Sequence, residues 1–220
     1  MSAVDPKVIA VKRPKPRLRG VSHLVGALCV VPLIIHLFRI QDGHAVATLV
    51  YGGSMYLLFA VSAFYHIPHW EPELRSTLRR VDRSMIYIFV AGTYTPILAG
   101  LGDNISPWVS PIVWSATSLG VFLTVCVPGL PRTLVTALYV ALGWGAIMIM
   151  PAVMEHAGMT SFWCLTSGGI FYTLGAIAYA FRWPDPLPRF FGYHEIFHLC
   201  VLIAAYLHYA GIRTILGQSL

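Results

Sequence analysis

Residues 194–215 read HEIFHLCVLIAAYLHYAGIRTI, and the charged side chains in this stretch, Glu195 and Arg213, lie near its two ends. A helix that spans a bilayer needs about 20 consecutive, predominantly apolar residues. This stretch is therefore long enough to cross a membrane. The whole chain has the same character, because 57% of its 220 residues are hydrophobic and only 11% are charged. Soluble domains average about 25% charged residues, so the composition excludes an ordinary soluble domain and a disordered chain.

Six further stretches have a similar length and apolar character, and the breaks between them carry proline, glycine and charge. The seven predicted spans are residues 18–38, 45–66, 82–101, 107–127, 133–153, 161–181 and 194–215. The sequence therefore predicts an all-α membrane protein, a seven-transmembrane-helix bundle. It comprises one membrane domain, residues 17–220, behind a disordered basic tail, residues 1–16.

The lysine and arginine residues predict the orientation of this bundle, because short loops rich in these residues stay on the cytoplasmic side. Thirteen of the fifteen fall on one side of the seven spans. They are Lys7, Lys12, Arg13, Lys15, Arg17, Arg19, Arg75, Arg79, Arg80, Arg83, Arg132, Arg182 and Arg189, against Arg39 and Arg213 on the other side. We therefore expect a cytoplasmic N-terminus and an outside C-terminus in a multi-pass protein of the cell membrane. The basic charge then indicates contact with membrane lipid and not with nucleic acid.

Three polar segments far apart in the sequence are predicted to meet at the cytoplasmic end of the bundle. The second span ends at His66, the third begins at Asp82, and the last begins with His194 and His198. Residues four apart lie on the same face of a helix, so His194 and His198 suit two ligands of one metal ion. With His66 as a third ligand and a water molecule, they would form a tetrahedral zinc site with one open position. Ser62 shares a helix face with His66.

Each of these residues also has a simpler interpretation. A single histidine near a helix end is commonly an interfacial residue, and Asp82 could pair with Arg79 or Arg83 or favour the start of a helix by its charge. Residues 194–198 also spell H-E-x-x-H, in which the glutamate of metalloproteases is a general base. The extended protease pattern fails downstream, and an acid such as Glu195 is favoured in a first helical turn in any case. His23, in the first turn of the first span, could support the site.

Several of these stretches together resemble the hallmark motifs of the hemolysin III family. They are SAFYH at 62–66, RRVDRS at 79–84, AGTYTP at 91–96 and HEIFH at 194–198. That family belongs to a superfamily of seven-helix membrane proteins with the progestin and adipoQ receptors, which also includes the alkaline ceramidases. Relatives commonly carry an acidic residue and an asparagine shortly before a Thr-His pair. Here residues 16–23 read PRLRGVSH, so the acidic residue is missing.

The resemblance implies a zinc ion near the cytoplasmic end, held by His66, His194 and His198, with Ser62 and Asp82 close to a zinc-bound water. It also implies a ceramidase-like, zinc-dependent hydrolase that acts on a lipid-like amide or ester, with Asp82 accepting a proton. One alternative is a receptor-like sensor of a ligand or of the membrane state, in which zinc is structural. Another is a pore-forming cytolysin, but no predicted span has a strongly charged face that would line a water-filled channel.

Overall fold

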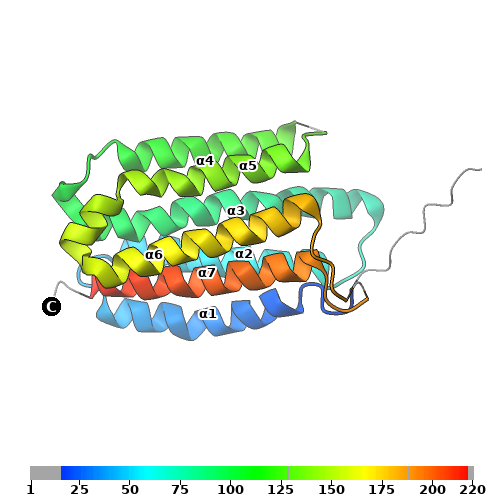
Figure 1. The fold of residues 1–220 in the computed structure, drawn as a ribbon, viewed down its shortest axis with the longest axis horizontal. Coiled ribbons are helices and arrows are strands. Elements are labelled where there is room, and N and C mark those ends of the chain that lie inside the picture. The colour runs from blue at the N-terminus through cyan, green and yellow to red at the C-terminus, as the bar shows by residue number, and fades with distance from the viewer. Residues whose placement is uncertain (1–15, 128, 188, 218–220) are drawn as a thin grey trace, which may run out of the picture.

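The computed structural model describes residues 16–127, 129–187 and 189–217, which form an elongated bundle of seven α-helices (Figure 1). The helices are α1 (Val21–Ile40), α2 (Ala45–His66), α3 (Pro72–Leu101), α4 (Val109–Cys126), α5 (Arg132–Trp144), α6 (Met150–Phe181) and α7 (Tyr193–Leu216). Two short 3-10 helices, η1 (Gly102–Asn104) and η2 (Gly145–Met148), follow α3 and α5. The predicted basic tail, residues 1–16, lies outside the described residues except for Pro16.

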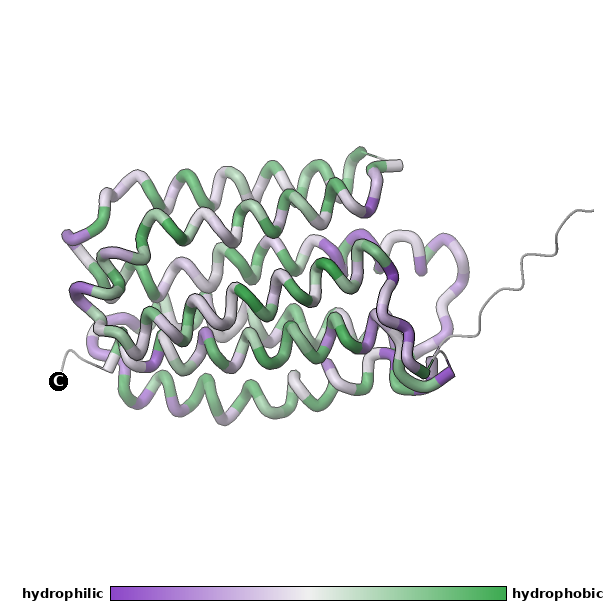
Figure 2. The backbone as a smooth tube through the Cα atoms, in the orientation of Figure 1, coloured by the Kyte–Doolittle hydropathy of each residue, from purple (hydrophilic) through white to green (hydrophobic). Residues whose placement is uncertain are grey.

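The helices have the length and composition of membrane-spanning segments. Six of the described helices are long and apolar enough to cross a bilayer, and the remaining apolar segment, Arg132–Met148, is shorter. Large apolar side chains lie on the outside of the bundle, as with Val46, which is 76% exposed, whereas Thr48 and Ser161 are fully buried. Figure 2 shows hydrophobic residues along the helices and hydrophilic residues mainly near the ends of the bundle. This arrangement suits a lipid environment, and it confirms the prediction of an all-helical membrane protein.

Close helix packing brings the functional helices together. α7 packs against α1, α3 and α6, and α2 packs against α1 and α3. In Figure 1, α4 and α5 lie side by side along the edge of the bundle farthest from α1. Two glycines allow close approach: a Cβ added at Gly92 would lie 2.1 Å from the Ser54 hydroxyl oxygen on α2, and one at Gly168 would lie 2.2 Å from the His208 ring on α7. Small residues at such crossings are typical of membrane helix interfaces.

α3 begins ten residues earlier than the predicted span 82–101. Its start is well formed for a helix, because Pro72 occupies the first turn and Glu73 places negative charge there. The residues before Asp82 are rich in charge, so hydropathy alone assigns them to a loop. Because α3 begins at Pro72, Arg75 and Arg79 lie on a helix and not in a loop.

The boundary between the predicted fifth and sixth spans also differs. α5 ends at Trp144, η2 follows, and α6 already begins at Met150 with Pro151 in its first turn. The break predicted between residues 153 and 161 is a kink within α6, where Gly158 adopts φ 77° and ψ 170°. Glycine reaches this region of positive φ without the steric cost that other residues meet.

Candidate metal centre

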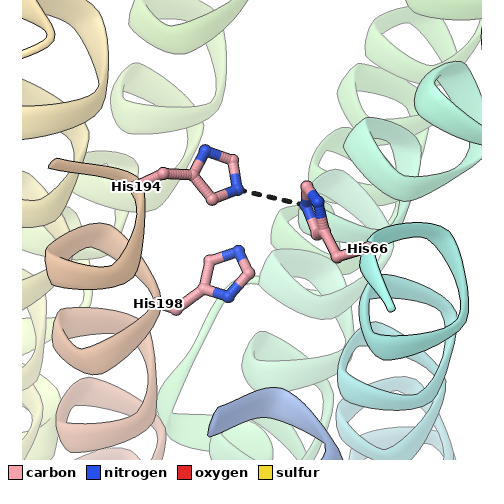
Figure 3. A group of neighbouring side chains, drawn as sticks. All are labelled: His66, His194 and His198. Carbon is pink, nitrogen blue, oxygen red and sulfur yellow. Dashed lines mark hydrogen bonds between the residues drawn. The ribbon is translucent and has the colours of Figure 1, made fainter. Parts of the chain in front are cut away.

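Three histidines from two helix ends lie together. His66 is the last residue of α2, and His194 and His198 are one turn apart at the start of α7. Figure 3 shows the three rings facing one another, and the Nε2 atoms of His66 and His194 are 3.1 Å apart. All three side chains are buried, with exposed fractions of 7%, 9% and 1%. The predicted convergence of these residues is therefore present in the fold.

The three imidazoles could hold a metal ion. One ligand nitrogen from each ring lies within 4.8 Å of the others, and no other group of three metal-binding side chains in the described residues is this compact. A zinc ion with nitrogen ligands at about 2.0–2.1 Å in a tetrahedron separates those nitrogens by roughly 3.3 Å, close to the distance between His66 and His194. Within the described chain, Nδ1 of His198 has no hydrogen-bond partner. A buried polar atom without a partner is unfavourable, so the donor set fits a shared cation.

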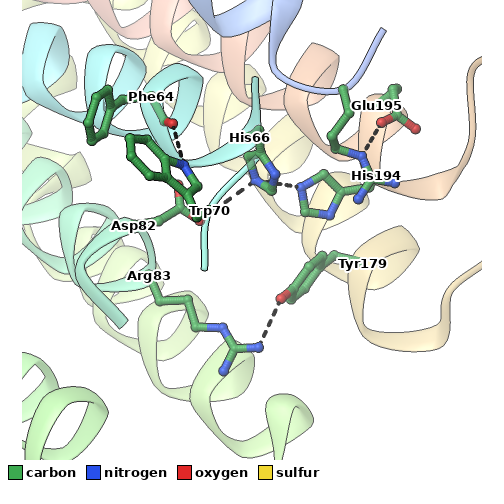
Figure 4. A network of polar contacts seen from close by, with 9 residues as sticks. Phe64, His66, Trp70, Asp82, Arg83, Tyr179, His194 and Glu195 are labelled. Carbon is green, nitrogen blue, oxygen red and sulfur yellow. Dashed lines mark hydrogen bonds and ion pairs between the residues drawn. The ribbon is translucent and has the colours of Figure 1, made fainter. Parts of the chain in front are cut away.

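Asp82 lies beside this group. Its Oδ2 atom is 3.8 Å from Nε2 of His66, and a dashed line in Figure 4 marks this contact. Ser62, one turn before His66 on α2, is 3% exposed, and its side chain interacts with Asp82. Among the described residues, no arginine nitrogen lies within the 4.0 Å of an ion pair with the Asp82 carboxylate, although Arg83 interacts with it electrostatically over a longer distance. Asp82 and Ser62 thus stand where the sequence predicts them, next to the histidines.

Glu195 has a structural role in this arrangement. Its Oε2 atom accepts a hydrogen bond of 2.8 Å from the backbone N–H of Gly192, and its Oε1 atom pairs with Nε of Arg19. Both oxygens therefore have partners, and the side chain is only 3% exposed. The carboxylate caps the start of α7 and binds it to the segment that precedes α1. The geometry favours this role over that of a general base.

His23 supports the group from α1. Its ring stacks on the ring of His198, with centroids 3.8 Å apart and planes at 6°. The side chain is 2% exposed, and neither ring nitrogen has a hydrogen-bond partner among the described residues. His23 therefore holds one face of His198 and fixes the orientation of that ring.

A cavity of about 280 Å³ extends from the histidines into the bundle between α3, α5, α6 and α7. Asp82, His194 and His198 line it at one end, and His208 lines it deeper along α7. The 14 residues from His194 to His208 correspond to about 21 Å of helix at 1.5 Å per residue. Most of the other lining side chains are apolar. The cavity is therefore long and suited to a hydrocarbon chain.

A second cavity, of about 270 Å³, lies at the ends of the helices beside the histidines. We call it the arginine vestibule, because six arginines line it: Arg19, Arg75, Arg79, Arg83, Arg132 and Arg182. Asp82, Arg83, Arg132, Tyr179 and His194 line both cavities. The candidate metal centre therefore stands where a charged space meets an apolar one.

Tyr179 organises the junction between these cavities, although no sequence motif points to it. Nη2 of Arg83 donates to the Tyr179 hydroxyl over 3.5 Å (Figure 4), and the guanidinium of Arg132 lies 4.9 Å from the centre of the Tyr179 ring. The ring of Tyr179 is also 5.6 Å from that of His194. From the sequence, Arg132 is only a topology signal, whereas Arg83 is a topology signal and a possible partner of Asp82. The proximity of Arg83 to Asp82 in the sequence is the signal that could have assigned it to the site.

Comparison with known proteins gives a consistent family. A family model described as "Haemolysin-III related" matches residues 11–209 of the chain. "Hemolysin-3" of Bacillus cereus is 34% identical over 189 residues, which are 83% of this chain and 83% of that protein. "Hemolysin-3 homolog" of Bacillus subtilis is 30% identical over 190 residues, 83% of this chain and 85% of its own.

The similarity extends to animal proteins. "Monocyte to macrophage differentiation factor" of Homo sapiens is 27% identical over 207 residues, which are 88% of this chain and 82% of that protein. On this chain, the range that the family model matches, residues 11–209, includes the candidate metal centre and the residues that line both cavities.

Proposed function

The chain belongs to the hemolysin III family, and on that premise we propose that it is a membrane hydrolase that uses zinc to cleave a lipid-like amide or ester. One observation carries this proposal. The buried nitrogens of His66, His194 and His198 converge beside Asp82, at the end of a long apolar cavity.

The residues around the histidines supply the remaining parts of such a reaction. His66, His194 and His198 would hold the zinc ion, which would supply polarisation of a carbonyl group and a bound water with a pKa of about 7. Oδ2 of Asp82 accepts the proton of the attacking water and passes it to the leaving nitrogen or oxygen. The water oxygen forms a bond to the carbonyl carbon, the carbon–nitrogen or carbon–oxygen bond breaks, and a carboxylic acid and an amine or alcohol result. Ser62 keeps Asp82 oriented toward His66.

The apolar cavity would hold the acyl chain of the substrate. One acyl chain covers half of a bilayer hydrocarbon core, and the whole core is about 30 Å thick. The cavity extends about 21 Å along α7, so it is longer than that half. An acyl chain in this cavity excludes bulk water from the reacting carbonyl. Membrane lipid is the source of such a substrate, since the outer surface of the bundle is apolar.

We also propose that the chain crosses the cell membrane seven times. The segment Arg132–Met148 is an apolar helix of a length at the lower end of the spanning range of about 17–25 residues. The arginine vestibule marks the cytoplasmic end by the positive-inside rule. The N-terminus is then cytoplasmic and the C-terminus outside, with residues 17–220 as the membrane domain and residues 1–16 as a tail beside anionic lipid.

This orientation is tested with a fusion protein. Alkaline phosphatase fused after residue 220 should be active, and an inactive fusion would reverse this orientation.

The hydrolase proposal is tested with purified protein whose metal content has been measured. We expect zinc to be present, and we expect release of fatty acid from at least one of three substrates: a ceramide, an N-acyl amide or a phospholipid. Substitution Asp82→Asn should slow release by about 10²–10⁴-fold while the metal remains, because the proton acceptor is lost and the three imidazoles are kept. Full zinc occupancy with no turnover of any of the three would contradict the proposal.

The histidines also support a second candidate function, a receptor-like sensor with structural zinc. A metal ion bound by His66 on α2 and by His194 and His198 on α7 would tie together two helices far apart in the sequence. In that case chelation should lower the melting temperature sharply, and Asp82→Asn should change no measured response.

A cytolytic pore is less compatible with the fold, since the long cavity is lined mainly by apolar side chains. Conductance of pure protein in planar bilayers tests it.

A further inference from the structure

We propose that the arginine vestibule binds a phosphate group, and that the substrate is therefore an acyl lipid with a phosphate-bearing headgroup. The position of the cleaved bond in this lipid rests on the proposed hydrolase function. The binding site itself rests on the charge and geometry of the vestibule alone.

The charge of the vestibule is strongly unbalanced. Six arginines line it, and the carboxylate among its lining residues is that of Asp82. In the part of the chain that the structure describes, Arg19 is the one vestibule arginine with a carboxylate within 4.0 Å, that of Glu195. A concave surface with several uncompensated cations attracts anions and concentrates them. Guanidinium groups bind phosphate oxygens with paired, charge-assisted hydrogen bonds.

Arg83 and Arg132 stand at the position that a phosphate joined to an acyl chain must occupy. Both line the vestibule and the long apolar cavity, so they mark the junction of the two. Their hydrogen-bond acceptors are neutral: Arg83 donates to the Tyr179 hydroxyl, and Nη2 of Arg132 donates to the carbonyl of Ala180 over 2.8 Å. Arg83 also interacts electrostatically with the single Asp82 carboxylate beside it. These contacts hold the two guanidinium groups in place, and in the described chain neither group has a carboxylate within 4.0 Å. Two arginines beside one carboxylate leave a net positive charge at the junction. A lipid with its phosphate here would place its acyl chain past the histidines into the apolar cavity.

Arginines at a membrane surface also contact bilayer phosphates without any specific site. Arg80 provides the control for this effect. It lies on α3 between Arg79 and Arg83, donates to the carbonyl of Val125 over 3.2 Å, and lines neither cavity. A general surface effect would depend on Arg80 as much as on Arg83, whereas a vestibule site would not.

The test uses the purified full-length protein and two lipids that cannot be hydrolysed. These are 1-O-hexadecylglycerol 3-phosphate and 1-O-hexadecylglycerol, which differ only in the phosphate, presented in phosphatidylcholine vesicles. We expect the wild type to bind the phosphate lipid at least about tenfold more tightly. Arg83→Gln and Arg132→Gln should each remove most of that preference, and Arg80→Gln should leave it intact. Should Arg83→Gln fail to fold, Arg83→Lys keeps the charge, removes the paired donors and should still weaken the preference.

Three results would overturn the inference. The first is equal affinity of the wild type for the two lipids. The second is a loss of the preference in Arg80→Gln as large as that in Arg83→Gln. The third is binding of inorganic phosphate as tight as that of the phosphate lipid, which would assign the vestibule to free phosphate. A parallel assay with the corresponding acyl esters separates this inference from the hydrolase proposal. Preferential binding of the phosphate lipid without cleavage of either ester would contradict the hydrolase function and support the phosphate site. Cleavage without a preference for the phosphate lipid would support the hydrolase function and contradict the phosphate site.

Discussion

The two halves of α7 place histidines in contrasting surroundings. In the first half, His194 and His198 face His66, and ring nitrogens lie next to ring nitrogens. In the second half, Nε2 of His208 lies 3.1 Å from the carbonyl oxygen of Leu165, and the Tyr209 hydroxyl lies 2.8 Å from Nδ1 of His36. Each contact in the second half joins a ring to an oxygen on a facing helix. A histidine inside a membrane bundle is thus not by itself a metal ligand, and convergence of several rings is the informative feature.

The largest expected effect is loss of bound metal when a histidine in the first half of α7 is replaced. Substitution His194→Ala should reduce bound metal to background, because two imidazoles are a poor site for a zinc ion that takes three or four protein ligands. Substitution His208→Ala should leave the metal content unchanged, because that ring already has a carbonyl partner. Metal analysis of the purified variants measures both. Equal metal content in the two variants would mean that the first half of α7 is no more a metal centre than the second.

The next effect separates binding of metal from chemistry. Substitution Asp82→Asn should lower the rate of acyl amide or ester cleavage by about 10²–10⁴-fold, the usual contribution of a general base, and should keep the metal. Asp103→Asn, in η1 at the opposite end of the bundle, is the matched control and should have no effect on rate. A metal-free Asp82→Asn protein would instead make Asp82 part of the metal site.

A third effect concerns the start of α7, which Glu195 binds to Arg19. Substitution Glu195→Gln should lower the free energy of unfolding by about 2 kcal/mol, since it leaves a half-buried arginine without its carboxylate. Arg19→Gln in the same background should add little further loss, and this double-mutant cycle identifies the pair. Unfolding in mixed detergent micelles measures the change. A large loss of turnover at unchanged stability would return Glu195 to a catalytic role.

The smallest effect tests the second half of α7 as packed structure. A methyl group added by Gly168→Ala would meet His208, whereas one added by Gly169→Ala would meet no atom within 4 Å. We expect Gly168→Ala to destabilise the protein by about 1 kcal/mol, the steric cost being partly offset by better helix propensity. Gly169→Ala should be neutral or slightly stabilising. Neither should change the metal content, and loss of metal in Gly168→Ala would join the two halves into one site.

Much of this arrangement is predictable from the sequence, for identifiable physical reasons. Apolar runs of bilayer length predict the helices, and the spacing of His194 and His198 predicts that their rings share a face. Charge at the helix ends predicts that His66 and Asp82 belong to the same end. These inferences use properties that are local in sequence, or that depend only on depth in the membrane.

The remaining features depend on contacts that no local pattern encodes. Arg19 and Glu195 are 176 residues apart, and nothing in the H-E-x-x-H spacing distinguishes a capping glutamate from a catalytic one. Tyr179 is one aromatic residue among many on an apolar helix, so its contacts with Arg83 and Arg132 appear only in the fold. The early start of α3 escapes hydropathy because its first turns are charged.

The separation of the histidines along the chain has a consequence for how the protein is made. His66 leaves the ribosome 128 residues before His194, an interval of roughly 6–26 s at about 5–20 residues per second. α7, which is synthesised after α2, supplies two of the three rings. Any metal ion that the three rings share could therefore be captured only after His198 has been synthesised, and metal loading would report that α7 has been inserted.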